Sequence, residues 1–347
     1  MTVQSVKALS ARKFFALTAA IFGITVATIS VCILIGSQLG FSESLSALLH
    51  PREAPLSQYQ IIYEFRLPRV LLAALVGAAL SVAGVTFQAI VRNPLAEPYI
   101  LGISSGGALG AVVAILIGAS VTIAGFSTVS VFSFVGCILT TAIVYLLARG
   151  RGHQVRYNLI LTGVIVGAFL SAFVLLFTAT LRHNDLPRVV FWLMGNLGTP
   201  LEDFPLSIIS LYVIVGSSLL FAASRGFNAI MLGDEAASAL GCSPGRVRSY
   251  GFFLGSLIVS AAVSVSGLVG FVGLIVPHTL RLIVGSDHRI LLPASFFAGA
   301  AFLCAADTLA RSVLPDRQIP VGVVTALCGA PVFLILMRTR MRKSYFG

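Results

Sequence analysis

The stretch from Arg66 to Gly107 constrains the fold of this chain more than any other part of the sequence. It opens with two arginines around a Leu-Pro pair and continues through about twenty apolar and small residues, enough to cross a bilayer core as a helix. The helix must then break, because the segment RNPLAEP at 92–98 has two prolines within five residues, with an Asn before the first and a Glu before the second. Small residues such as Gly77 and Gly84 permit close helix packing in lipid. This stretch therefore predicts a spanning helix followed by a polar loop.

Composition extends this prediction to the whole chain. A mean hydropathy of +1.00, with 57% hydrophobic and only 10% charged residues, excludes an ordinary soluble domain. We therefore predict an all-α polytopic membrane protein that forms one transmembrane domain over residues 1–347. The net charge of +11 is explained better by membrane topology than by nucleic-acid binding, so no nucleic-acid partner is expected.

Apolar windows divide the chain into about ten predicted transmembrane helices. They fall near 14–36, 68–91, 99–118, 121–148, 158–181, 204–224, 250–268, 271–284, 290–310 and 319–337. The windows at 250–268 and 271–284 are short and poorly separated, so the count depends on whether they form two helices or one.

The distribution of basic residues predicts the orientation. An even number of spans places both termini on one side, and both termini are basic, so we expect them in the cytoplasm. Of the 23 Lys and Arg residues, sixteen then lie on the inner side and seven on the outer side. The outer residues are Arg52, Arg66, Arg69, Arg182, Arg188, Arg311 and Arg317.

A weak internal repeat relates the second and seventh predicted spans. The sequence SVAG at 81–84 recurs as SVSG at 264–267, and a proline and a glycine follow at the same offsets. These are Pro94 and Gly102 in the first copy and Pro277 and Gly285 in the second. Spans an odd number apart run in opposite directions, so the pattern predicts an inverted internal repeat. Coincidence is the alternative, because both spans are rich in small residues.

A polar island at 226–249 separates the sixth and seventh predicted spans. Within it, Asp234 and Glu235 begin a short helix, where the helix dipole favours acidic side chains, and Gly241 ends it. By the predicted topology this element faces the cytoplasm. It is either a solvated connector or an amphipathic contact surface for a partner.

Three arginines on the predicted outer side also require a reason. Arg66 and Arg69 are three residues apart at the start of the second span, and Arg311 follows Asp307 by four residues. Guanidinium groups that extend to the membrane interface, or a local Asp307–Arg311 pair, would account for them. A docking surface for an acidic partner is the other interpretation.

The sequence contains no motif for chemistry on this chain. There is no GxxxxGK[ST] loop to bind nucleotide phosphates, so ATP would have to be bound by another chain. The five histidines and five cysteines lack metal-ligand spacing, and no nucleophile–base arrangement is visible. We therefore predict no catalytic residue and no metal site, and we expect this protein not to be an enzyme.

Four motifs together carry a resemblance to a known family. They are RLPR at 66–69, NPLAEP at 93–98, GDEAASALG at 233–241 and GFVGLIVPHTLRLIVGSDHR at 270–289. In this order they resemble the FecCD family, the permease subunits of type II ABC importers for vitamin B12, haem and ferric siderophores. The resemblance extends from Arg66 to about Met337 and supports the inverted repeat.

The resemblance implies roles for particular residues. It makes the island at 226–249 a segment that couples transport to a cytoplasmic ATPase, through Gly233, Asp234, Glu235, Ala236, Ala237, Leu240 and Gly241. It makes Arg66, Arg69 and Arg311 partners of glutamates on a periplasmic binding protein. Asn93 and Leu95 match positions at a cytoplasmic gate, for which a simple turn is the alternative. The span at 158–181 would line the channel.

The resemblance also implies partners and a location. These are a homodimer of this chain, two ABC ATPase subunits that carry ATP and Mg²⁺, and a periplasmic substrate-binding protein, at a bacterial inner membrane. This chain itself would bind no cofactor. The cargo would be a bulky metal chelate, namely a ferric siderophore, haem or cobalamin, and the sequence does not distinguish them.

Two other function classes fit less well. A secondary transporter driven by an ion gradient needs a buried carboxylate or charged relay in its spans, and Asp307 is the one candidate. A membrane-embedded enzyme would need a motif such as HExxH or a clustered triad, and the sequence has neither.

Overall fold

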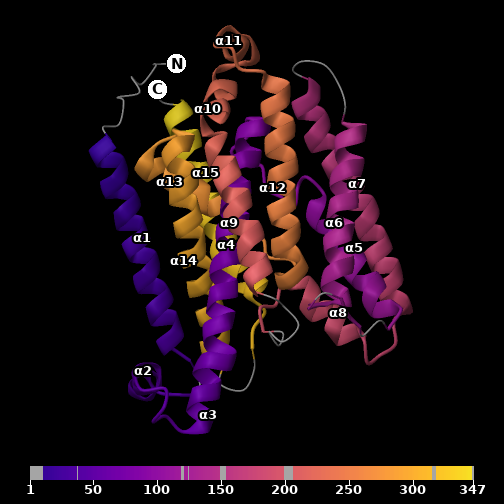
Figure 1. The fold of residues 1–347 in the computed structure, drawn as a ribbon. Helices are drawn as coiled ribbons and strands as arrows, with labels where there is room; N and C mark the ends of the chain where they lie inside the picture. Colours follow the sequence, from indigo (N-terminus) through magenta and orange to yellow (C-terminus); the bar gives the residue numbers. More distant parts are fainter. Residues whose placement is uncertain are drawn as a thin grey trace.

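The chain folds as a bundle of long helices (Figure 1). The computed structural model describes residues 11–36, 38–118, 121–123, 125–148, 154–198, 206–314 and 318–345. The first half contains α1 (Ala11–Leu34), α2 (Phe41–Leu49), α3 (Leu56–Tyr59), the π-helix η1 (Gln60–Arg66), α4 (Leu67–Val91), α5 (Ile103–Leu116), β1 (Thr122–Ile123), β2 (Phe126–Ser127), α6 (Thr128–Leu147) and α7 (Gln154–Thr180). The second half contains α8 (Leu186–Leu193), α9 (Leu206–Ala222), α10 (Ser224–Leu232), α11 (Asp234–Ala239), α12 (Pro244–Ser266), α13 (Val272–Val284), α14 (His288–Ser312) and α15 (Val321–Tyr345).

The helices match the predicted apolar segments. Within the described ranges, six helices are long and apolar enough to cross a membrane, and α9 and α10 form a seventh span with a 49° bend. Three shorter apolar helices, α5, α13 and the first part of α15, account for the remaining segments. The all-α polytopic class is confirmed, with the two-residue strands β1 and β2 as a minor addition. The windows at 250–268 and 271–284 are separate helices, α12 and α13.

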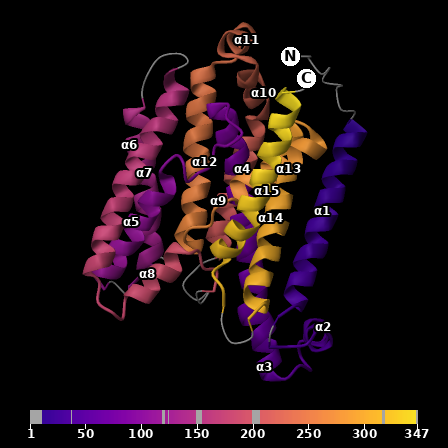
Figure 2. The same cartoon turned by 180° about the vertical axis from the view of Figure 1, so that it is seen from behind.

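The two ends of the bundle differ. α1 begins and α15 ends at the end that carries α11, as an even number of spans predicts (Figure 1). The short helices α2 and α3 lie at the opposite end. Seen from behind, α5 to α8 form one flank and α1 the other (Figure 2). Which end faces the cytoplasm stays a prediction, and Lys7, Arg149, Arg151 and Arg317 from the charge count lie outside the described residues.

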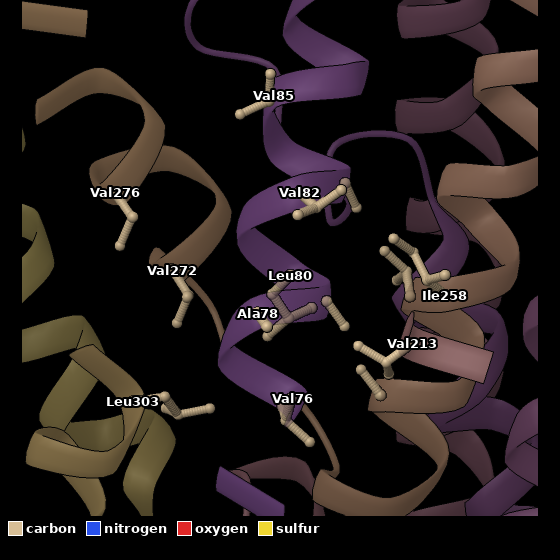
Figure 3. Close-up of a cluster of buried hydrophobic side chains, with 14 of the residues drawn as sticks. Val76, Ala78, Leu80, Val82, Val85, Val213, Ile258, Val272, Val276 and Leu303 are labelled. Carbon is tan, nitrogen blue, oxygen red and sulfur yellow. The ribbon is translucent and has the colours of Figure 1, made fainter. Parts of the chain in front are cut away.

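α4 forms the centre of the bundle. In the span that ends at Val91, 83% of the most apolar window is buried, against 17% for α1. Figure 3 shows α4 between α13 and α14 on one side and α9 and α12 on the other, with apolar side chains of all five helices between them. Glycines bring the backbones together, because a Cβ on Gly77 would overlap the carbonyl oxygen of Gly299, and one on Gly84 that of Gly273. This close packing is the role predicted for the small residues of α4.

Two helices begin inside the bundle, after loops that return from a longer helix. α5 begins after Gly102, whose φ is 77°, and α13 begins after Phe271, whose φ is 68°. The long helices that precede them, α4 and α12, run in opposite directions (Figure 1). The plan of long helix, loop and short helix thus occurs twice with opposite polarity, as an inverted repeat requires.

Side chains stabilise the start of α13. The amide N of Phe271 donates to Glu97 Oε1 at 2.5 Å, and Gln88 Nε2 donates to the carbonyl oxygen of Gly273 at 3.1 Å. Arg281 in turn donates to Gln88 Oε1 at 2.5 Å. The RNPLAEP loop and α4 therefore hold the broken helix in place, which explains why a glutamate lies between the two prolines of the loop.

The contact between α4 and α13 can be tested with one methyl group. Gly84→Ala should lower the free energy of unfolding by about 1–3 kcal/mol, because the added Cβ overlaps the backbone of Gly273. Gly23→Ala is the matched control, since an added Cβ on Gly23 in α1 meets nothing within 4 Å. Thermal unfolding of the purified protein in detergent measures both. Equal melting temperatures of the two variants would contradict the close helix contact.

Candidate functional site

The predicted coupling segment contains a short helix that projects from one end of the bundle (Figure 1). The turn between α10 and α11 is made by Gly233, whose φ of 128° is accessible mainly to glycine. α11 then covers Asp234–Ala239, and Gly241, with φ of 76°, follows as the predicted terminator. The first third of the segment at 226–249 belongs to α10, which continues α9 after a bend.

The seven predicted coupling residues divide between two faces. Glu235, Ala236 and Leu240 are exposed, with 67% of Leu240 accessible, and Leu232 beside them is 69% accessible. Ala237 is fully buried, and Asp234 is half-buried against the bundle. An exposed apolar patch at a projecting tip is typical of a contact surface for another protein. Asp234 has a different role, because its hydrogen-bond partners belong to this chain.

Asp234 lies among cations from three other helices or their ends. Its Oδ1 accepts a hydrogen bond from Arg92 Nη2 at 2.6 Å and another from Arg248 Nη2. Arg156 of α7 is also close enough to act on it electrostatically. Partial burial alone would raise the pKa of Asp234, but the hydrogen bond and charge of Arg248, together with Arg92 and Arg156, lower it below the ordinary value. The carboxylate therefore stays ionised.

The predicted gate residues form a tight turn directly after Arg92. Arg92 ends α4 in the left-handed conformation, with φ of 50°. Asn93 Oδ1 accepts a hydrogen bond from the amide of Leu95 at 2.9 Å, which is the turn-starting role that the sequence left open. Asn93 and Leu95 are both half-buried. The structure thus brings the predicted gate and Asp234 together through one residue, Arg92.

The three predicted docking arginines lie at the opposite end and are mostly buried. Arg66 is 6% exposed, and its Nη1 donates to Ser44 Oγ at 2.9 Å and to the carbonyl oxygen of Ile33 at 3.4 Å. Arg311 is 9% exposed and donates to the carbonyl oxygen of Cys32 and to Thr308 Oγ1. Charge counting placed these residues at one membrane surface but did not predict that their guanidinium groups point inward.

Asp307 pairs mainly with Arg69 rather than with its sequence neighbour Arg311. Arg69 Nη2 and Nε donate to the carboxylate at 2.8–3.1 Å, and Arg69 Nη1 donates to Gln318 at 2.8 Å. Arg311 Nε is 3.8 Å from Asp307 Oδ2. One buried carboxylate therefore serves two arginines, whereas Arg66 donates to neutral oxygens of Ile33, Leu34 and Ser44. This cluster holds more positive than negative charge.

The predicted channel helix α7 presents an apolar free surface. Its glycines are not on that surface, because Gly163 and Gly167 pack against the loop before α5 and its first turn. Phe169, Leu175 and Leu176 are among its exposed side chains, with 62%, 72% and 56% accessible. Ser171 is the exposed hydroxyl in the middle of the helix. The middle of this surface is thus uncharged and mostly apolar.

Metal chemistry has no obvious site in the part of the chain that the structure describes. Within those ranges, His, Cys, Asp and Glu side chains do not gather in groups of three that could hold a metal ion. The five cysteines are unpaired, with Cys32, Cys137 and Cys304 buried.

A second polar cluster was missed by the sequence analysis. Asn228 of α10 donates to Asp287 Oδ1 at 2.7 Å, and its own oxygen accepts from the amide of His288 at 2.9 Å. Hydrogen bonds from Arg289 and Asn228 lower the pKa of Asp287 to about 2. These contacts fix α10 to the start of α14. The nearest sequence signal was the SDHR ending of the fourth motif, which carried no predicted role.

Comparisons with known proteins agree with this arrangement. Residues 21–339 match the model of the FecCD transport family. A cobalamin import system permease protein, BtuC, of Halobacterium salinarum is 42% identical over 287 residues, which cover 82% of this chain and 75% of that protein. A hemin transport system permease protein, HmuU, of Yersinia pestis is 38% identical over 292 residues, 83% of this chain and 86% of that protein.

A solved structure has the same fold over nearly the whole length. It is an inward-facing conformation of an ABC transporter assigned to the metal-chelate type, with a TM-score of 0.79 and 33% identity. The match covers 94% of this chain and 99% of that chain.

The ion pair of Asp307 yields a stability prediction. Asp307→Asn should lower the free energy of unfolding by about 3–5 kcal/mol, because it leaves Arg69 and Arg311 close together without a compensating charge. Glu64→Gln, an exposed change in η1 at the same end, should stay within about 0.5 kcal/mol of the parent. Unfolding in detergent followed by circular dichroism distinguishes them. If Asp307→Asn melts like the control, the cluster does not depend on this carboxylate.

Proposed function

This chain belongs to the FecCD transport family, and we propose from that membership how its two ends and its exposed helix are used. The protein is the membrane-spanning permease subunit of an ABC importer and is not itself an enzyme. Such a subunit works with an ATPase and a binding protein. The assignment of each partner to a surface is our proposal.

The observation that carries the proposal is the projecting helix α11 with its exposed Glu235 and Leu240. We propose that this face enters a cleft of the ATPase subunit, which binds ATP and Mg²⁺, while this chain binds no cofactor. An exposed leucine at the tip of a turn is costly in water and is stabilised by burial against a partner. The α11 end would then be cytoplasmic, with both termini on that side.

The opposite end would receive the substrate-binding protein. Arg69 and Arg311 share the carboxylate of Asp307, while Arg66 bonds to the hydroxyl of Ser44, so an acidic side chain from a partner would complete the charge balance. Guanidinium groups hold carboxylates in a fixed geometry, which suits a docking contact. Because these arginines are nearly buried, the partner's acidic residues must reach into the surface rather than meet flexible side chains in water.

The exposed apolar surface of α7 would be covered by a second copy of this chain. A homodimer would place two such helices around a channel and two turns containing Asn93 and Leu95 opposite each other as a gate. Two ATPase subunits would then bind the two copies of α11. An uncharged channel wall suits a bulky chelate, because it offers no group for tight binding along the path.

The cargo belongs to the range that the relatives carry. Their names specify cobalamin and hemin, and the matched structure is of the metal-chelate type. We propose a metal chelate for this chain, with a ferric siderophore, haem or cobalamin as the candidates. An ion-gradient mechanism has no support at Asp307, because that carboxylate is held by Arg69 in a salt bridge.

The ATPase contact can be tested on the exposed face of α11. Leu240→Ser should weaken binding of the ATPase subunit by about 1.5–3 kcal/mol, the contribution of one buried leucine. Glu235→Lys on the same face should weaken it too. Leu49→Ser is the control, since Leu49 is exposed to a similar degree at the other end of the molecule. Co-purification with the ATPase gives the readout. Undiminished binding of both α11 variants would show that this face is only a connector.

Docking can be tested with salt and with neutral arginine replacements. Raised salt should weaken the complex with the binding protein, because it screens the charge contact. Arg66→Gln should weaken it by several kcal/mol only where the pair is desolvated on docking, and by about 0.2–1 kcal/mol where it stays in water. Arg52→Gln, an exposed change at the same end, is the control. A larger loss in the control would assign docking to the exposed arginine instead. Melting temperatures of both variants exclude unfolding.

A further inference from the structure

Asp234 connects two regions that the proposed function treats separately. It is the first residue of α11, and its carboxylate accepts a hydrogen bond from Arg92 at 2.6 Å. Arg92 directly follows the last residue of α4 and precedes Asn93, which forms the turn with Leu95. The coupling helix and the proposed gate are thus joined by one ion pair across 142 positions of sequence.

We propose that Asp234 is a positioning residue that transmits the movement of α11 to the gate turn through Arg92. The ATPase contact itself is made by the exposed face of α11. This inference rests on the proposed function, in which an ATPase moves α11 and the turn at Asn93 controls passage.

The charges around Asp234 make the position of Arg92 depend on the Asp234 carboxylate. Arg92 and Arg248 both bind the same carboxylate oxygen, and their side chains are only 16% and 7% exposed. Without the carboxylate, two partly buried guanidinium groups would repel each other, with Arg156 adding to the repulsion. The position of Arg92, and with it the start of the gate turn, therefore depends on where α11 holds Asp234.

The backbone at both ends of the ion pair favours transmission. Gly233 precedes Asp234 with φ of 128°, and an added Cβ there would meet nothing within 4 Å, so α11 is joined to α10 by a single residue without a side chain, in open space. Arg92 is fixed differently, because its amide bonds back to Ala89 and the next amide bonds to Gln88. A shift of Asp234 is thus passed to a residue that is rigidly attached to α4.

α10 remains anchored without Asp234. Asn228 bonds to Asp287 and to the amide of His288, and Ala237 of α11 is fully buried. Loss of the Asp234 carboxylate should therefore leave the coupling helix in place for the ATPase. This separates a transmitting role from a role in holding the segment to the bundle.

The experiment uses the complete transporter in liposomes, with the ATPase and the binding protein. Two quantities are measured for the parent, Asp234→Asn, Arg92→Gln and the double variant: cargo imported per ATP hydrolysed, and the change that ATP causes in thiol labelling of Leu95→Cys. Arg246→Gln is the matched control, since it removes one exposed positive charge from the same end of the molecule.

Each single variant should keep the ATPase bound and hydrolysing ATP, while cargo per ATP falls about fivefold or more, the lower end of coupling between linked sites. The ATP-dependent change in labelling should be lost with it. The double variant should be no worse than either single variant, because both remove the same contact. Arg92→Lys keeps the charge and should retain most of the parental ratio, whereas damage to the turn would not be rescued.

Parental coupling in Asp234→Asn, or losses that multiply in the double variant, would overturn the inference. A third result would also overturn it: Asp234→Asn binds less ATPase, but the complexes that do form import as much cargo per ATP as the parent. Asp234 would then be a docking residue. If the parent complex imports no cargo when ATP is supplied, the proposed function and this inference are both rejected. If the parent imports cargo and the variants import it equally well, only the inference is rejected.

Discussion

Backbone groups inside a membrane have no water to bond with, and this constraint determines how the broken helices are built. A loop that returns into the bundle exposes amides and carbonyls that must find partners in the protein. Here the amide of Phe271 bonds to Glu97, and the carbonyl oxygen of Gly273 bonds to Gln88. Both partners come from α4 or the loop after it. The position of α13, and of the elements packed on it, therefore depends on that loop.

The same region explains why small residues dominate α4. Side chains that reach across to a neighbouring loop require that the backbones lie close together. Gly84 permits this at α13, and Gly77 permits it at α14, where any larger residue would overlap a carbonyl oxygen. The close packing and the hydrogen bonds of the buried polar groups thus depend on each other. A wider spacing of the helices would break the hydrogen bonds of Gln88 and Glu97.

The sequence predicted the local features well, because they depend on short-range patterns. Apolar length predicted the spans, and the acidic pair Asp234 and Glu235 and the terminator Gly241 predicted the start and end of α11. Contacts between residues far apart in the sequence could not be predicted. The pairing of Arg69 with Asp307 across 238 positions, and of Arg92 with Asp234, depends on which helices become neighbours. The inward direction of Arg66 could not be predicted either, because its side chain bonds to the end of α1 and to Ser44 of α2, and α2 has no strong sequence signal.

α4 relates the two charged clusters to each other. Arg69 lies in its first turn and Arg92 at its end, about 35 Å apart along a straight helix at 1.5 Å per residue. At each end an arginine of α4 binds an aspartate from the second half of the chain, Asp307 of α14 or Asp234 of α11. A buried helix of this length resists compression, since shortening it would break backbone hydrogen bonds in lipid. The two ion pairs therefore cannot move independently along the helix axis, and any displacement at one membrane surface has a rigid connection to the other.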